Sequence, residues 1–99
     1  MIYLISYDIT SNKKRYKISK LLKGQGAVRL QKSVFAIHLS RTGLKGLRQS
    51  LHKAWGTATK NNDKLFILKI HQTAFHNMSM LGQQLDPILA LGQASVVVI

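Results

Sequence analysis

Residues 1–8 read MIYLISYD, a short run of apolar and aromatic side chains that ends in an acid. Both alternating faces of this run are apolar as far as Ser6, which is typical of a strand covered on both sides and therefore central in its sheet. Thr10–Asn12 then supply turn and capping residues, and a helix is predicted over about 13–23. Its apolar stripe consists of Ile18, Leu21 and Leu22.

The segment 27–40 is extended, but its apolar pattern changes phase. Apolar residues first occupy even positions and then odd ones, namely Val28 and Leu30 followed by Phe35, Ile37 and Leu39. A pleated strand cannot change its buried face without a bulge or a turn, so Gln31–Ser33 must contain one. No Gly or Asn-Gly marks the position, and the residues there leave a bent strand and a tight hairpin as open alternatives.

A second helix is predicted over about 43–55, with Thr42 as its cap. Its apolar residues at helical spacing are Leu44, Leu47, Leu51 and Ala54. A polar loop at 56–63 leads to another strand at 65–70, after which the pattern weakens. Near the end of the chain, Asp86 and Pro87 are typical of a helix start with Gly92 as its end, and a β-branched strand is predicted at 95–99.

This order of elements predicts an α+β fold, a ferredoxin-like βαββαβ sandwich with an additional C-terminal strand. At 99 residues the chain is expected to form one domain, with its core at about 1–72 and a C-terminal extension and tail strand at about 73–99. An unpaired apolar strand at the end of a chain promotes aggregation. We therefore expect the tail strand to add to the sheet of a second copy in a homodimer.

The composition indicates an anionic partner. Fifteen Lys and Arg residues face three Asp and no Glu, which gives a net charge of +12. Such a field attracts polyanions, and nucleic acid is favoured because the cations fall on folded amphipathic segments. The candidate nucleic-acid-binding residues are Lys13, Lys14, Arg15, Lys17, Lys20, Arg29, Lys32, Lys45 and Arg48. The absence of cysteine excludes disulfides and thiolate metal sites, and without an export signal or a long apolar run we expect a cytoplasmic protein with no membrane partner.

Asp8 is the candidate for metal chemistry, because it stands where the first strand ends and Mg²⁺ prefers oxygen ligands. From position alone, a turn carboxylate neutralised by Lys13–Arg15 is the simpler interpretation. Two-metal nucleases need several carboxylates at one site, and this chain offers only Asp8, Asp63 and Asp86. Any centre for Mg²⁺, or alternatively Mn²⁺, must therefore be poor in ligands or be shared between two protomers that face each other at Asp8.

Histidines and aromatic residues give weaker indications. The four histidines are His38, His52, His71 and His76, and none has metal-ligand spacing with a partner, so surface or phosphate-contacting positions are expected. Tyr7, Tyr16 and Phe35 are able to stack on bases, but their alternating or helical positions predict that they belong to the core.

Several of these segments together resemble a known family. They are YDI at residues 7–9, a basic helix followed by Gly26, and QKSVF at 31–35. This combination resembles the second core CRISPR-associated protein family, CRISPR-associated protein 2, strongly over residues 1–40 and more weakly to about 70. Many members have an acid directly after Ser-Val-Phe, whereas this chain has Ala36, and its excess of basic charge is high.

The resemblance implies a ferredoxin-like homodimer in which each chain lends its C-terminal strand to its partner. It implies that Asp8 is the catalytic and metal-binding residue for Mg²⁺-dependent cleavage of RNA or DNA. It also implies a scaffold that binds duplex DNA and joins dimers of the CRISPR integrase during spacer integration, a role that Ala36 and the basic charge favour. The alternatives are a stand-alone metal-dependent ribonuclease toxin of the virulence-associated type and a non-catalytic basic RNA-binding protein.

Overall fold

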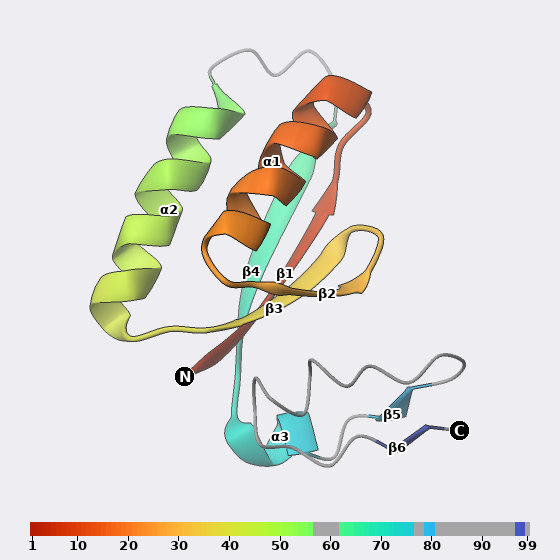
Figure 1. Ribbon diagram of the computed structural model, residues 1–99, viewed down its shortest axis with the longest axis vertical. Helices are drawn as coiled ribbons and strands as arrows, with labels where there is room; N and C mark the ends of the chain where they lie inside the picture. Colours follow the sequence, from red (N-terminus) through yellow and green to blue (C-terminus); the bar gives the residue numbers. More distant parts are fainter. Residues whose placement is uncertain (57–61, 77–78, 81–96, 99) are drawn as a thin grey trace.

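The computed structural model describes residues 1–56, 62–76, 79–80 and 97–98. Its elements are β1 (Ile2–Asp8), α1 (Asn12–Gly24), β2 (Val28–Gln31), β3 (Val34–His38), α2 (Arg41–Trp55), β4 (Lys64–Ile70), α3 (Gln72–His76), β5 (Ser79–Met80) and β6 (Val97–Val98). The main sheet is antiparallel in the order β2-β3-β1-β4, and α1 and α2 cover one side of it, called here the helix side (Figure 1). This α+β arrangement is consistent with the predicted ferredoxin-like fold.

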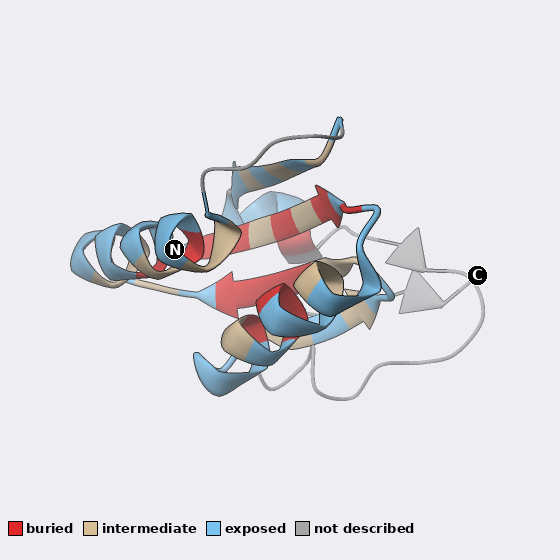
Figure 2. Cartoon of the chain, turned by 90° about the horizontal axis from the view of Figure 1, so that it is seen from above, coloured by how far each residue is buried: buried red, intermediate tan, exposed pale blue. Residues whose placement is uncertain are grey.

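β1 is a central strand, as its apolar pattern predicted. It pairs with β3 on one side and with β4 on the other, so that Ile5 lies opposite both Phe35 and Ile67. Successive side chains of a strand alternate between the two faces of its sheet, and the odd-numbered ones of β1 are buried on the helix side. The helices pack against them through Ile18, Leu22, Leu47 and Leu51. In Figure 2 the buried segments accordingly lie on β1, β3 and the inner faces of the helices, whereas the edge strand β4 is exposed or intermediate.

The phase change at residues 31–33 is a hairpin that also contains a bulge. β2 and β3 pair antiparallel with Gln31 opposite Val34, and the register shifts between Arg29 and Gln31. The change from even to odd apolar positions reflects the two faces of the sheet. Val28 and Leu30 pack with Ile2 and Ala36 on the side away from α1 and α2, whereas Phe35 and Ile37 belong to the core on the helix side. Of the two alternatives that the sequence left open, the tight hairpin is therefore confirmed.

Serine residues cap both long helices. The side chain of Ser11 accepts a hydrogen bond from the backbone N–H of Lys14 at 3.3 Å, which agrees with the predicted start of α1. At α2 the cap is Ser40, whose side chain accepts from the N–H of Gly43 at 3.1 Å. The prediction that Thr42 caps this helix was wrong, because Thr42 already belongs to its first turn.

The other side of the main sheet, called here the open face, is covered only in part by the residues that the structure describes. Phe75 of α3 is fully buried there and packs with Ile2 and Ala36. Farther along the edge strand, the side chains of Phe66 and Leu68 remain 61% and 59% exposed. α3 was not predicted from the sequence, and the open face that it leaves uncovered is an unusual place for two large apolar side chains.

The C-terminal strand is present at Val97–Val98, within the predicted range of 95–99. It pairs in parallel with Ser79–Met80 of the same chain, and its pairing with a second copy stays a prediction. The helix predicted from Asp86 and Pro87 to Gly92 lies outside the described residues. Among the helices of the described part, none has the length and apolar character needed to span a bilayer.

Candidate functional site

Asp8 is the last residue of β1, and it is exposed. Its neighbours Tyr7 and Ile9 are both buried in the core on the helix side, so strand alternation places Asp8 on the open face, together with Phe66. In register it lies opposite Lys64 of β4. Within the part of the chain that the structure describes, its carboxylate forms no ion pair.

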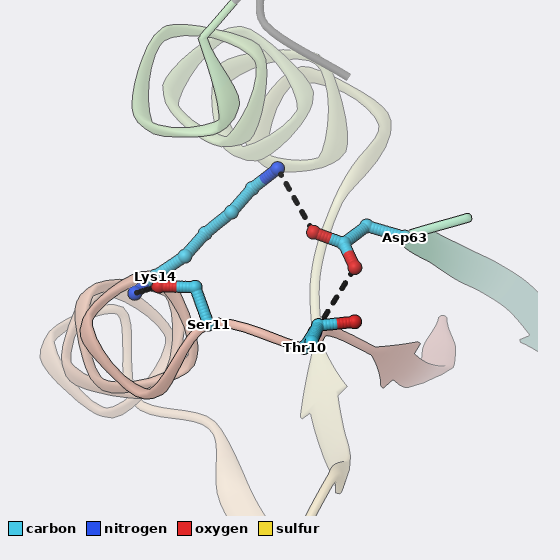
Figure 3. A network of polar contacts seen from close by, with 4 residues as sticks. All are labelled: Thr10, Ser11, Lys14 and Asp63. Carbon is cyan, nitrogen blue, oxygen red and sulfur yellow. Dashed lines mark hydrogen bonds and ion pairs between the residues drawn. The ribbon is translucent and has the colours of Figure 1, made fainter. Parts of the chain in front are cut away.

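The acid that is neutralised is Asp63, which lies just before β4. One carboxylate oxygen accepts a hydrogen bond from the backbone N–H of Thr10 at 3.0 Å, and the other lies 3.6 Å from the Nζ of Lys14 (Figure 3). The same Nζ lies 3.8 Å from the centre of the Trp55 ring. These contacts hold the β1–α1 loop against the segment that enters β4, so this carboxylate has a structural role.

The surroundings of Asp63 stabilise its charged form. The hydrogen bond from the backbone of Thr10, and then the charge of Lys14, hold the pKa of Asp63 below its usual value of 3.8. The simpler interpretation of Asp8 assigned Lys14 to that residue as part of a neutralising group. Lys14 pairs with Asp63 instead, so it does not neutralise Asp8.

A hard divalent cation suits the oxygen chemistry of Asp8, but one chain does not provide enough ligands. In the residues that the structure describes, no group of three or more His, Cys, Asp or Glu side chains gathers at one place. Protein-bound Mg²⁺ is usually held by one or two carboxylates and completed by water. A resident Mg²⁺ at Asp8 would therefore either have few protein ligands or be shared with a second Asp8 from another copy.

Cations are concentrated at the start of α1. Lys13, Lys14 and Arg15 follow one another in its first turn, and no acid accompanies them. The positive end of the helix dipole lies here, so each cation costs about 0.3–1 kcal/mol of helix stability. Lys17 and Lys20 continue the exposed basic surface along the helix.

Four of the candidate binding residues are brought together in one cavity of about 500 Å³ between α1 and the β2–β3 hairpin. Its cationic lining consists of Arg15, Lys20, Lys23, Arg29 and Lys32. Lys23 was missed by the sequence analysis, although its spacing of three residues from Lys20 indicated the same helix face. Among the described residues that line the cavity there is no acid.

The other candidate cations lie elsewhere. Lys45 and Arg48 are exposed on α2, where Arg48 borders a second hollow of about 530 Å³ next to β4. Of the histidines, His38, His52 and His71 are exposed, as expected, and the side chain of His76 lies outside the described part of the structure.

The aromatic residues divide into two groups. Tyr7 and Phe35 are buried, as predicted, and their rings stack at a centroid distance of 6.2 Å. The prediction that Tyr16 belongs to the core was wrong, because its side chain is 69% exposed. At 3.6 residues per turn Tyr16 lies about 200° around the helix from the buried Ile18, which places it on the outer face of α1.

Comparison with known proteins assigns the family. The family model of CRISPR associated protein Cas2 matches residues 1–78. This chain belongs to the Cas2 family. The match confirms the resemblance found in residues 1–40 and extends past the predicted limit of about 70.

Curated relatives support the same assignment. The chain is 34% identical over 87 residues to the CRISPR-associated endoribonuclease Cas2 1 of Chloroflexus aurantiacus, covering 88% of this chain and 90% of that protein. It is 29% identical over 97 residues to the CRISPR-associated endoribonuclease Cas2 3 of Synechocystis sp., covering 98% of both. Among solved structures, the hypothetical protein TT1823 from Thermus thermophilus matches with a TM-score of 0.61 at 30% identity, over 71% of this chain and 80% of that one.

Proposed function

We propose that this Cas2 family chain acts in CRISPR adaptation as a homodimer that binds nucleic acid through its phosphates. We further propose that it cleaves phosphodiester bonds with a Mg²⁺ ion held between the Asp8 carboxylates of two protomers. The observation that carries the proposal is that Asp8 lies on the same open face as the exposed side chains of Phe66 and Leu68.

The open face supports dimerisation by its apolar character. Exposed apolar patches on soluble proteins mark interaction sites, since their burial contributes roughly 25 cal/mol per Å². In the sheet register Phe66 lies opposite Ser6, two residues from Asp8. A two-fold axis that buries Phe66 against a second copy therefore also brings the two copies of Asp8 toward each other.

Two carboxylates that approach each other repel, and a shared divalent cation removes this repulsion. When bound, Mg²⁺ would lower the pKa of a coordinated water and offset the negative charge that develops on the phosphoryl oxygens. The chain itself contributes the Asp8 oxygens that hold the ion and the cations of the first turn of α1, which begins four residues later. Of these cations, Lys13 neutralises a substrate phosphate there and helps to fix the course of the strand.

The names of the curated relatives favour RNA as the substrate of cleavage. The high positive charge also supports binding to duplex DNA, and hence a scaffold that presents DNA to the CRISPR integrase in the cytoplasm. The two activities use different residues, because binding depends on the cations of α1 and cleavage depends on Asp8. A role as a DNA scaffold therefore does not require cleavage at Asp8.

The substitution Asp8→Asn separates cleavage from binding. We expect cleavage of single-stranded RNA in the presence of Mg²⁺ to fall at least about a hundredfold. Affinity for a blunt DNA duplex should stay within about twofold, since the substitution removes no cation. Cleavage that survives in Asp8→Asn contradicts the catalytic proposal, and wild-type protein that binds DNA but never cleaves supports the scaffold alone.

Two further measurements address the alternatives. A CRISPR adaptation protein should co-elute with the CRISPR integrase in size-exclusion chromatography, whereas a stand-alone ribonuclease toxin should not, and should arrest growth when expressed. A basic RNA-binding protein without catalytic function should be monomeric at micromolar concentration and should have no affinity for duplex DNA.

A further inference from the structure

The cavity between α1 and the β2–β3 hairpin has the features of a binding site and not only of a charged surface. It lies on the helix side of the sheet, and so on the opposite side from Asp8. Its volume of about 500 Å³ is in the range of small-molecule sites. Five cations from α1 and from the hairpin line it, so it attracts anions.

Arg29 is held in place inside this cavity by neutral groups. Its Nη2 donates a hydrogen bond of 3.0 Å to the hydroxyl of Ser19, which is 7% exposed. Its Cζ lies 5.2 Å from the centre of the Phe35 ring, which is itself fully buried. A guanidinium has five N–H donors, so this arrangement orients Arg29 while most donors and the whole charge stay available.

Lys14 of α1 provides a contrast to Arg29 of β2. Its charge is matched by Asp63 at 3.6 Å, so it has a partner within the chain. Arg29 has a hydroxyl and an aromatic ring in place of a carboxylate, and no ion pair in the described part of the chain. Such a pre-oriented and uncompensated arginine is suited to a phosphate, because its fork matches phosphate oxygens in pairs.

Tyr16 adds a flat apolar surface to the wall of the cavity. Its ring is 69% exposed on α1, and the Nζ of Lys20 lies 6.0 Å from its centre. An exposed ring beside a phosphate-binding group is the arrangement with which proteins bind unpaired bases by stacking. The bases of a duplex are already stacked on each other, and they are therefore not accessible to this ring.

We propose that this cavity is a subsite for one unpaired nucleotide, with its phosphate on Arg29 and its base stacked on Tyr16. This subsite rests on the proposed nucleic-acid binding, because the cationic surface of α1 must bind the rest of the strand. It implies a preference for single strands, or for duplexes with unpaired ends, over blunt duplexes.

Fluorescence anisotropy at fixed salt tests this subsite with two probes, a labelled six-nucleotide single strand and a blunt duplex of twenty base pairs. Tyr16→Leu removes the ring but keeps an apolar residue at an exposed position, so the fold should be retained. We expect Tyr16→Leu to weaken single-strand binding about tenfold and to leave the duplex within about twofold. Arg29→Gln should weaken single-strand binding at least about tenfold and duplex binding by much less, since for the duplex it removes only one cation from the basic surface. Arg29→Lys, which keeps the charge but not the fork, should recover only part of the loss.

Arg41→Gln is the matched control, since it removes an exposed arginine from α2 outside the cavity. It should affect the two probes equally. If Tyr16→Leu and Arg29→Gln also lower the affinity for both probes equally, or lower neither, the subsite is absent. If instead the affinity for the single strand depends on Tyr16 while the wild-type protein fails to bind duplex, the subsite is supported and the proposed DNA scaffold is wrong.

Discussion

The two sides of the main sheet differ in whether their charged and apolar side chains find partners within one chain. On the helix side, Asp63 has its partners within the chain, and Arg29 is oriented by the hydroxyl of Ser19. On the open face, Phe66 remains largely exposed and Asp8 forms no ion pair in the described part of the chain. The helix side thus supplies an ordered surface for an anion, whereas the open face leaves apolar area and a carboxylate for another protein surface to complete.

The largest effect should come from salt acting on the helix side. If a dimer places about six cations on phosphates, its affinity for duplex DNA should fall about a thousandfold between 50 and 200 mM salt, because each contact releases a counterion. Titrations over this range measure the slope directly. A flat response would mean that the cations of α1 do not contact phosphates.

A substitution on the open face should give the next largest effect. Phe66→Lys places a charge where the proposal buries an aromatic ring, so the dimer dissociation constant should rise at least about thirtyfold. Sedimentation velocity at micromolar concentration measures this change. Phe66→Leu is the control that keeps an apolar side chain and should stay dimeric, and a dimer that survives Phe66→Lys would place the interface elsewhere.

The smallest effect should be on thermal stability, in which Asp63 and Asp8 are expected to differ. Folding lowers the pKa of Asp63 below its usual value of 3.8. The charged carboxylate therefore stabilises the fold fully at pH values above 3.8, and this contribution is lost as the pH falls through the pKa of the folded state. Asp63→Asn should therefore lower Tm at pH 7, and the difference from wild type should vanish in strong acid. Asp8→Asn should leave Tm unchanged, and a loss as large as that of Asp63→Asn would indicate that Asp8 is also a structural carboxylate.

Much of the fold was predictable because its information is local. The apolar period of residues 1–8 identified a central strand, and Ile18 with Leu22 identified the buried face of α1. The cap of α2 was mistaken because Ser40 and Thr42 are both good capping residues two positions apart. α3 was missed because its five residues are too few for a helical period, and the burial of Phe75 depends on strands distant in sequence.

The candidate site was predictable only where one segment determines it. Asp8 was located by its place at the end of a strand, and the cations of α1 by their composition. The position of Arg29 beneath Ser19 depends on how the β2–β3 hairpin packs against α1, which no pattern in either segment specifies. The exposure of Tyr16 could have been predicted, since its angle around the helix from Ile18 follows from the helical period alone.

The pairing of two open faces around Asp8 is the central claim, and the absence of cysteine from the chain permits a direct test. Asp8→Cys provides one thiol per protomer, and a disulfide forms only when the two Cα atoms approach to within about 7 Å. Mild oxidation should therefore yield a covalent dimer of Asp8→Cys rapidly, more slowly when Phe66→Lys is added, and hardly at all for Arg41→Cys on the helix side. If Asp8→Cys stays monomeric under these conditions, or cross-links no faster than Arg41→Cys, the two aspartates do not meet and the shared metal site is contradicted.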